Sequence, residues 1–172
     1  MNEVIRCLKE RRSVRAYRPE QISEEQLQAI LEAGTYAPSG MGKQSAILVV
    51  IQDKETIANL SRMNAAVMGA EIDPFYGAPT LVIVLADRSS FTWHEDGCLV
   101  MGNLMNAAYA VGVDSCWIHR AKEVFETEEG QAMLQAWGIE GDYVGVGNCI
   151  LGYRAGDLPK PHPRKDNYIY RV

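Results

Sequence analysis

Basic side chains gather near both ends of this sequence, and their chemistry suits a phosphate monoester. The N-terminal group places a serine among arginines, and the C-terminal group follows a proline-rich stretch. An arginine offers a planar fork of N–H donors that matches two phosphate oxygens, and a hydroxyl adds a neutral donor. Together the two ends would surround one dianion. The residues concerned are Arg11, Arg12, Ser13, Arg15, Arg164 and Lys165.

The same charges have a plainer interpretation, which stays open at this point. A basic cluster after a short helix is also typical of a solvated helix end, and a basic C-terminus is typical of a solvated tail. Ser13 favours the phosphate interpretation for the N-terminal group, since it adds a hydroxyl donor between the charges.

Two glycine-bearing segments suggest nucleotide motifs but lack the context that those motifs need. Gly145 and Gly147 match the start of a dinucleotide fingerprint, yet Ile150 replaces the third glycine and no helix is expected to follow. The stretch ending at Gly42 lacks the first glycine of a phosphate-binding loop, and Gln44 replaces its Ser or Thr. Neither segment predicts a nucleotide site.

Histidines and cysteines are scattered, so no metal site and no catalytic residue is assigned. The three histidines are isolated in sequence, and the four cysteines form neither a CxxC pair nor a cluster at metal-ligand spacing. Buried free thiols are the preferred interpretation of the cysteines. The residues are His94, His119 and His162, with Cys7, Cys98, Cys116 and Cys149.

Composition predicts one globular domain spanning residues 1–172, with 47% hydrophobic and 23% charged residues. The net charge of −5 argues against nucleic acid or an anionic membrane as a partner, because both require a basic face. No segment has the apolar length of a membrane span or the apolar core of a signal peptide. We therefore expect a cytoplasmic protein.

Hydrophobic periodicity predicts an α+β protein, or an α/β sandwich, whose buried strands carry helices on their faces. Ser23 and Gln26 have capping-box spacing, and the helix that they begin is expected to stop at Gly34. The other helices are expected over 2–10, 57–67, 96–111 and 126–137. Buried strands are expected over 46–51, 80–86, 114–118 and 143–152.

The segments 96–111 and 157–172 suggest that the chain does not act alone. Apolar residues occur on nearly every face of the helix predicted over 96–111, and a chain this short has difficulty enclosing a whole helix. A second copy is expected to cover part of it. The segment 157–172 carries three prolines and is expected to be an extended arm.

Taken together, these motifs resemble the FMN-binding nitroreductase family over essentially the whole chain. The similarity lies in the Arg-Arg-Ser-Val-Arg run at 11–15 and the loop 37–44, Ala-Pro-Ser-Gly-Met-Gly-Lys-Gln. It continues in the strand 114–118 and in the segment 145–153, which precedes the basic arm. The resemblance implies a central mixed sheet covered by helices, with the C-terminal arm exchanged in a homodimer.

The resemblance also implies a flavoprotein with two FMN molecules at the dimer interface and a role for each matching residue. Arg11, Arg12, Ser13, Arg164 and Lys165 would hold the phosphate. Arg15 would reach the pyrimidine edge of the flavin, where a cation stabilises the charge gained on reduction. The remaining expected contacts to the flavin are Pro38, Ser39, Gly40 and Gln44 of the partner chain, backbone N–H groups of Ile118 and His119 near N5, and the amide of Asn64.

The implied activity is ping-pong hydride transfer from NADH or NADPH, through flavin N5, to a small electron-poor acceptor such as a nitroaromatic, a quinone or an enone. Two alternatives are a reductive dehalogenase-like reaction on the same scaffold and a non-catalytic FMN-binding or redox-sensing protein. The chain departs from the family pattern at Gly42, where many relatives carry Asn, and at Ser45 and Ala46. It is also short, so any lid over the substrate must be small.

Overall fold

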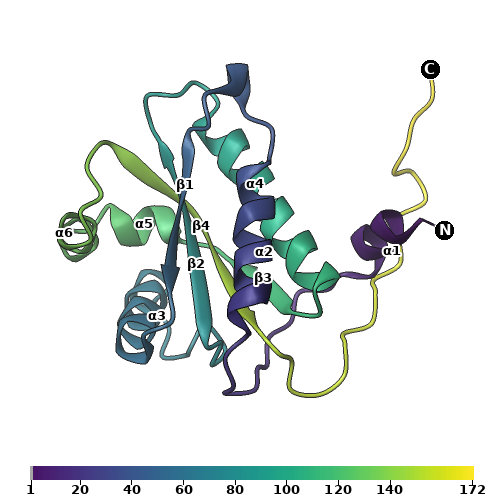
Figure 1. The fold of residues 1–172 in the computed structure, drawn as a ribbon, viewed down its shortest axis with the longest axis horizontal. Helices are drawn as coiled ribbons and strands as arrows, with labels where there is room; N and C mark the ends of the chain where they lie inside the picture. Colours follow the sequence, from purple (N-terminus) through teal and green to yellow (C-terminus); the bar gives the residue numbers. More distant parts are fainter. Residues whose placement is uncertain (1) are drawn as a thin grey trace.

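A four-stranded sheet forms the centre of the fold (Figure 1). The computed structural model describes residues 2–172. The strands lie in the order β1-β2-β4-β3, and every neighbouring pair is antiparallel. The α+β class expected from the periodicity is confirmed. The strands are β1 (Ala46–Ile51), β2 (Thr80–Asp87), β3 (Asp114–Ile118) and β4 (Tyr143–Gly152).

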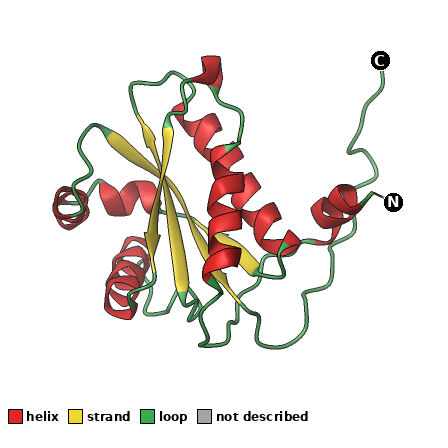
Figure 2. Ribbon diagram, in the orientation of Figure 1, coloured by secondary structure: helices red, strands yellow, loops and turns green. Residues whose placement is uncertain are grey.

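Helices cover both faces of this sheet (Figure 2). Along β2, Leu81 and Ile83 point to one core and Val82 and Val84 to the other, as the two-residue period of a strand requires. A strand covered on both faces becomes apolar throughout, which explains why β2 lacks alternation. One face carries α2 (Glu24–Thr35) and α4 (Trp93–Ala110), and the other α3 (Lys54–Met68), α5 (Ala121–Phe125) and α6 (Glu128–Ala136).

The expected mixed character of the sheet rests on a single pairing. Among residues 2–172, the one parallel pairing is the isolated bridge between Ser13 and Ser115, where the Val14 N–H donates to the Ser115 carbonyl at 3.1 Å. The segment after α1 (Glu3–Glu10) therefore meets β3 at Ser115, in the same direction. Arg15 directly follows this contact in the chain.

The helix boundaries confirm one sequence signal and correct another. Ser23 and Gln26 form the expected capping box, with the Gln26 N–H donating to Ser23 Oγ at 3.2 Å. Gly34, however, does not stop the helix, which continues to Thr35. A Cβ at Gly34 would approach Leu104 Cδ2 to 2.7 Å. The glycine is needed for close packing of α2 against α4.

Two further expectations are wrong in detail. β1 was expected to be buried, but only Ile51 is, and Val50 is 38% exposed. β1 lies at one edge of the sheet and β3 at the other, and only β1 is left half-buried or exposed along most of its length. Neither the pairing order nor the cover over each edge can be read from the sequence of the strand itself. The segment expected as a helix over 126–137 forms α6 from Glu128 onward, with Thr127 as its cap, and the short α5 before it was missed.

Helix α1 and the first part of the C-terminal arm lie side by side, away from the sheet (Figure 1). Helix α1 (Glu3–Glu10) has no buried residue, and its apolar Val4, Ile5 and Leu8 are about half exposed or more. The segment 157–172 forms no helix or strand, as expected of an extended arm. On α4, Leu99 is also 47% exposed, so one chain leaves part of this helix uncovered.

Candidate functional site

A cleft of about 800 Å³ lies between the end of α1 and the C-terminal arm. We call it the arginine cleft, because four arginines line it and Glu10 is the one acid in its lining. The structure thus brings together the two basic groups that are more than 140 residues apart in sequence. Of the expected phosphate ligands, Arg11, Arg12, Ser13, Arg15 and Arg164 line this cleft. Lys165 does not: its Nζ lies 5.3 Å from the centre of the Tyr168 ring.

Two guanidinium atoms in the arginine cleft are buried without a hydrogen-bond partner among residues 2–172. These atoms are Arg11 Nη1 and Arg12 Nε. The Arg12 side chain is held in place by its Nη1, which donates to the carbonyls of Lys9 and Arg11, each at 2.8 Å. A buried donor that lacks an acceptor is costly, and such groups in native proteins normally have one. An anion in this cleft would supply the acceptors, so the residues present fit a phosphate.

The chain turns at residues 118–120, from the last residue of β3 to the N-cap of α5, and this 118–120 turn is fixed by buried amides. Asn148 Nδ2 lies 3.3 Å from the carbonyls of both Ile118 and His119, and Asn64 Nδ2 donates to the His119 carbonyl at 2.8 Å. Arg120 Nε in turn donates to Asn64 Oδ1 at 3.0 Å. These bonds leave the His119 side chain exposed while its backbone is held.

Asn64, expected as a direct flavin contact, has a different place in this structure. Its side chain is fully buried, and both its carbonyl and its amino group are engaged within the protein. The structure therefore gives Asn64 the role of holding the 118–120 turn in place.

The arginine cleft and the 118–120 turn lie along one line at the edge of the sheet. The bridge between Ser13 and Ser115 aligns residues 11–15 with the approach to the turn. From Ser115 to His119 an extended chain advances about 13 Å, at roughly 3.3 Å per residue. A ligand with a phosphate at one end and a planar ring at the other would span this distance.

The loop 37–45 is held by a buried carboxylate, Asp96 at the start of α4. Its Oδ1 accepts from the Gly40 N–H at 2.9 Å, and its Oδ2 accepts from Ser45 Oγ at 2.6 Å and Thr92 Oγ1 at 3.2 Å. Burial alone would raise the pKa of Asp96, but these hydrogen bonds outweigh it and lower the pKa below its usual value. A Cβ at Gly40 would collide with Thr92 Oγ1, so this position requires glycine.

This loop is far from the arginine cleft within one chain. In Figure 1 the short 3-10 helix η1 (Gly40–Gly42) stands at the top of the view, whereas α1 lies at the right edge. Ser39 and Gln44 line a separate hollow between α2 and β1, and the Gln44 N–H donates to Ser39 Oγ at 2.9 Å. One chain does not unite the loop that includes Pro38, Ser39, Gly40 and Gln44 with the expected phosphate ligands.

Sequence reasoning missed Asp96, Asn148 and Arg120. A signal was available for Asn148, which interrupts an apolar strand and is 3% exposed. A polar residue in such a segment normally has a hydrogen-bonding task. Asp96, 2% exposed, follows Glu95 in the first turn of a helix, where acids are common. No sequence pattern marks Arg120.

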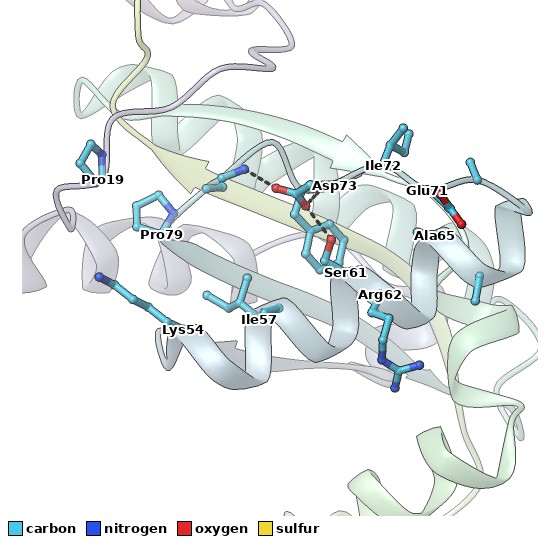
Figure 3. Close-up of a pocket in the computed structure, with 16 residues that line it drawn as sticks. Pro19, Lys54, Ile57, Ser61, Arg62, Ala65, Glu71, Ile72, Asp73 and Pro79 are labelled. Atoms are coloured by element: carbon cyan, nitrogen blue, oxygen red, sulfur yellow. Dashed lines mark hydrogen bonds between the residues drawn. The ribbon is translucent and has the colours of Figure 1, made fainter.

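The most apolar hollow lies elsewhere, between α3 and residues 70–79, with a volume of about 800 Å³ (Figure 3). Its main polar group, Asp73, is satisfied by Ser61 Oγ at 2.6 Å and by the N–H groups of Phe75 and Gly77. Lys54 and Arg62 lie along its rim (Figure 3). The hollow offers apolar surface rather than converging reactive groups.

No helix within residues 2–172 has the length and apolar character needed to cross a membrane. Nor do three or more His, Cys, Asp or Glu side chains gather there in a way that would hold a metal ion.

The protein is thus an α+β protein with an antiparallel sheet, helices on both faces and a cationic cleft built from both chain ends. Residues 8–153 match the Nitroreductase family, and the chain belongs to that family.

Solved structures and curated relatives agree with this assignment. A nitroreductase with bound FMN from Bacteroides fragilis superposes with a TM-score of 0.92 at 33% identity, over 100% of both chains. Another with bound FMN, from Desulfitobacterium hafniense, gives a TM-score of 0.89 at 26% identity, also over 100% of both. An NADH dehydrogenase of Thermus thermophilus is 30% identical over 155 residues, which is 87% of this chain and 68% of that protein.

Proposed function

We propose that this protein is an NAD(P)H-dependent FMN oxidoreductase that works as a homodimer. The observation that carries the proposal is the pair of buried, unpartnered guanidinium atoms of Arg11 and Arg12 in the arginine cleft. Family membership supports it, as do similar proteins described as nitroreductases with bound FMN.

In this proposal the arginine cleft binds the FMN phosphate. Arg11 and Arg12 supply charge-assisted hydrogen bonds from the N-terminal side, Ser13 adds a hydroxyl, and Arg164 approaches from the arm. Lys165 completes the charge around the cleft from just beyond its lining. Because the cations come from both chain ends, FMN binding also orders the arm against α1.

The bound FMN supplies the chemistry, accepting a hydride at N5 from NADH or NADPH and returning it to a second substrate. The protein orients the flavin and sets its electrostatic surroundings. Arg15, which lines the arginine cleft on its sheet side, meets the pyrimidine edge. The 118–120 turn, whose carbonyls are held by Asn148 and Asn64, directs backbone N–H groups of Ile118 and His119 toward N5.

A second copy of the chain completes the site. The loop 37–45 is distant from the arginine cleft of its own chain, so Pro38, Ser39, Gly40 and Gln44 reach the flavin of the partner. The exposed apolar residues of α1 and the exposed Leu99 on α4 support an interface there, because such residues are normally covered. In this dimer the C-terminal arm is exchanged between the chains.

The second substrate is a small electron-poor acceptor, such as a nitroaromatic, a quinone or an enone. The segment between α3 and β2 supports this size, since only residues 69–79 join the two elements and they include no helix. A small substrate needs no large lid.

Steady-state oxidation of NADH and NADPH tests the activity. The purified protein, supplied with FMN, should oxidise one of the two nucleotides continuously when menadione or a nitrobenzoate is added. One nucleotide is oxidised for each menadione reduced to its hydroquinone, and two for each nitro group reduced to the hydroxylamine. Protein that binds FMN but gives no turnover with any of these acceptors would instead be a flavin store or redox sensor.

A further inference from the structure

Arg120 has a backbone conformation that is unusual for a long side chain. Its φ of 71° lies in the left-handed region, which glycine and asparagine occupy far more easily. Residues held in such conformations cluster at functional sites, where the surrounding structure enforces them. The position directly follows Ile118 and His119, whose N–H groups the proposed function directs at flavin N5.

The Arg120 side chain is also fixed in place. Its Nε donates to Asn64 Oδ1 at 3.0 Å, and Asn64 is itself bound to the His119 carbonyl. The guanidinium is thus tied to the same turn that its own backbone forms. This connection keeps the charge beside the turn rather than in the solvent.

No carboxylate of residues 2–172 lies at ion-pair distance from Arg120. Arg62, Arg88 and Arg154 all pair with carboxylates, whereas Glu95 and Glu123 line the same hollow as Arg120 without pairing with it. Nε is committed to Asn64, and the two terminal amino groups remain for another partner. An arginine held firmly but left unpaired is arranged to face negative charge from outside the chain.

We propose that Arg120 stabilises the negative charge of reduced FMN from the N5 side and so raises the reduction potential of the bound flavin. This inference rests on the proposed function. A flavin whose N5 meets the N–H groups of Ile118 and His119 lies next to this guanidinium, because Arg120 is the next residue of the chain. Arg15 acts from the opposite, pyrimidine side, so the two cations bracket the ring. A fixed cation favours the more negative redox state more strongly than the oxidised one.

The test compares the affinity of oxidised and reduced FMN for the wild type and for Arg120→Gly. Glycine keeps the left-handed backbone without strain and removes the cation. We expect the ratio of the dissociation constants, oxidised over reduced, to fall at least tenfold, which lowers the two-electron potential by about 30 mV. Arg120→Lys should retain most of the wild-type ratio. Titration with oxidised FMN and anaerobic titration with dithionite-reduced FMN measure the two constants without turnover.

Lys122→Ala is the matched control, because it removes the same charge from an exposed residue two positions further along. Its ratio should stay within twofold of the wild type. A ratio that is unchanged in Arg120→Gly overturns the proposal, as does an equal fall in Lys122→Ala. Should Arg120→Gly not fold, Arg120→Asn, which also accepts a positive φ, takes its place under the same criteria. A wild-type protein that binds no FMN instead overturns the proposed function, and this inference with it.

Discussion

The arginine cleft and the loop 37–45 are the two parts of the proposed flavin site, and they differ in how their polar groups are satisfied. In the cleft, Arg11 Nη1 and Arg12 Nε are buried without acceptors in the described chain. In the loop, Asp96 accepts from the Gly40 N–H, from Ser45 Oγ and from Thr92 Oγ1. The cleft needs a ligand to be complete, whereas the loop is complete without one.

This difference predicts separate roles for the arginine cleft and the loop 37–45. A preformed loop loses little conformational freedom on binding, so it contributes shape and position. The arginine cleft contributes binding free energy, because a bound anion accepts hydrogen bonds from the unpaired donors of Arg11 and Arg12. Mutations in the loop 37–45 should therefore mainly lower the free energy of unfolding. Mutations in the arginine cleft should mainly weaken FMN binding.

The largest effect is expected from Asp96→Ala, which removes the acceptor that the whole loop shares. Leaving the Gly40 N–H and Ser45 Oγ without it should lower the free energy of unfolding by about 3 kcal/mol. Urea unfolding of the FMN-free protein measures this loss. FMN affinity should fall as well, because the loop no longer holds its shape.

Asp73→Ala is the matched control for this variant. Asp73 also accepts hydrogen bonds from one hydroxyl and two backbone N–H groups, but it lies in the segment 70–79. It should destabilise the protein while FMN affinity stays within about twofold of the wild type. Equal losses of FMN affinity in both variants would show that general destabilisation, rather than the loop, sets the affinity.

The next largest effect is expected from Arg11→Ala, which should weaken FMN binding without lowering the stability of the FMN-free protein. FMN affinity should weaken by about 1.5 to 3 kcal/mol, the contribution of a hydrogen bond to a charged group. Stability without FMN should not fall and should rise slightly, because the removed donor is buried without an acceptor in the FMN-free protein. Isothermal titration and urea unfolding give the two numbers.

Arg62→Ala provides the comparison for that variant, since Arg62 is exposed and pairs with Glu129 at 2.7 Å outside the proposed site. It removes one positive charge and should leave FMN affinity unchanged. If Arg62→Ala weakened FMN binding as much as Arg11→Ala, overall charge would explain the effect and the arginine cleft would lose its assigned role.

The smallest effect is expected from pH. Because the pKa of folded Asp96 is lowered by its hydrogen bonds, its contribution to stability is present above the ordinary aspartate pKa of about 3.9 and is lost as pH falls through the lower folded value. The wild type should therefore lose more stability than Asp96→Asn between pH 5 and the acid transition. Parallel curves for the two proteins would contradict the lowered pKa.

Much of the fold follows from local patterns. The bounds expected for the strands 114–118 and 143–152 agree with β3 and β4, and the capping box of Ser23 is present. These features depend on neighbours in sequence. The exposure of β1 and the internal position of Gly34 depend instead on which element lies beside them, and that information is not local.

The candidate site, like the fold, has one part that the sequence predicts and one part that it does not. The convergence of the two basic groups was predictable, because residue type and charge point to a shared anion. The roles of Asn148 and Arg120 were not predictable. Hydrophobic periodicity indicates which residues are buried, but not which carbonyl a buried amide binds. The αL backbone at residue 120 has no sequence marker, because arginine rarely adopts it.

Flavin titration of the purified wild-type protein tests the central claim most directly. The account predicts a yellow dimer that retains one FMN per chain, releases it on denaturation with the mass of FMN, and binds FMN more tightly than riboflavin, which lacks the phosphate. A colourless monomer that ignores added FMN, or a protein that binds riboflavin equally well, would contradict it.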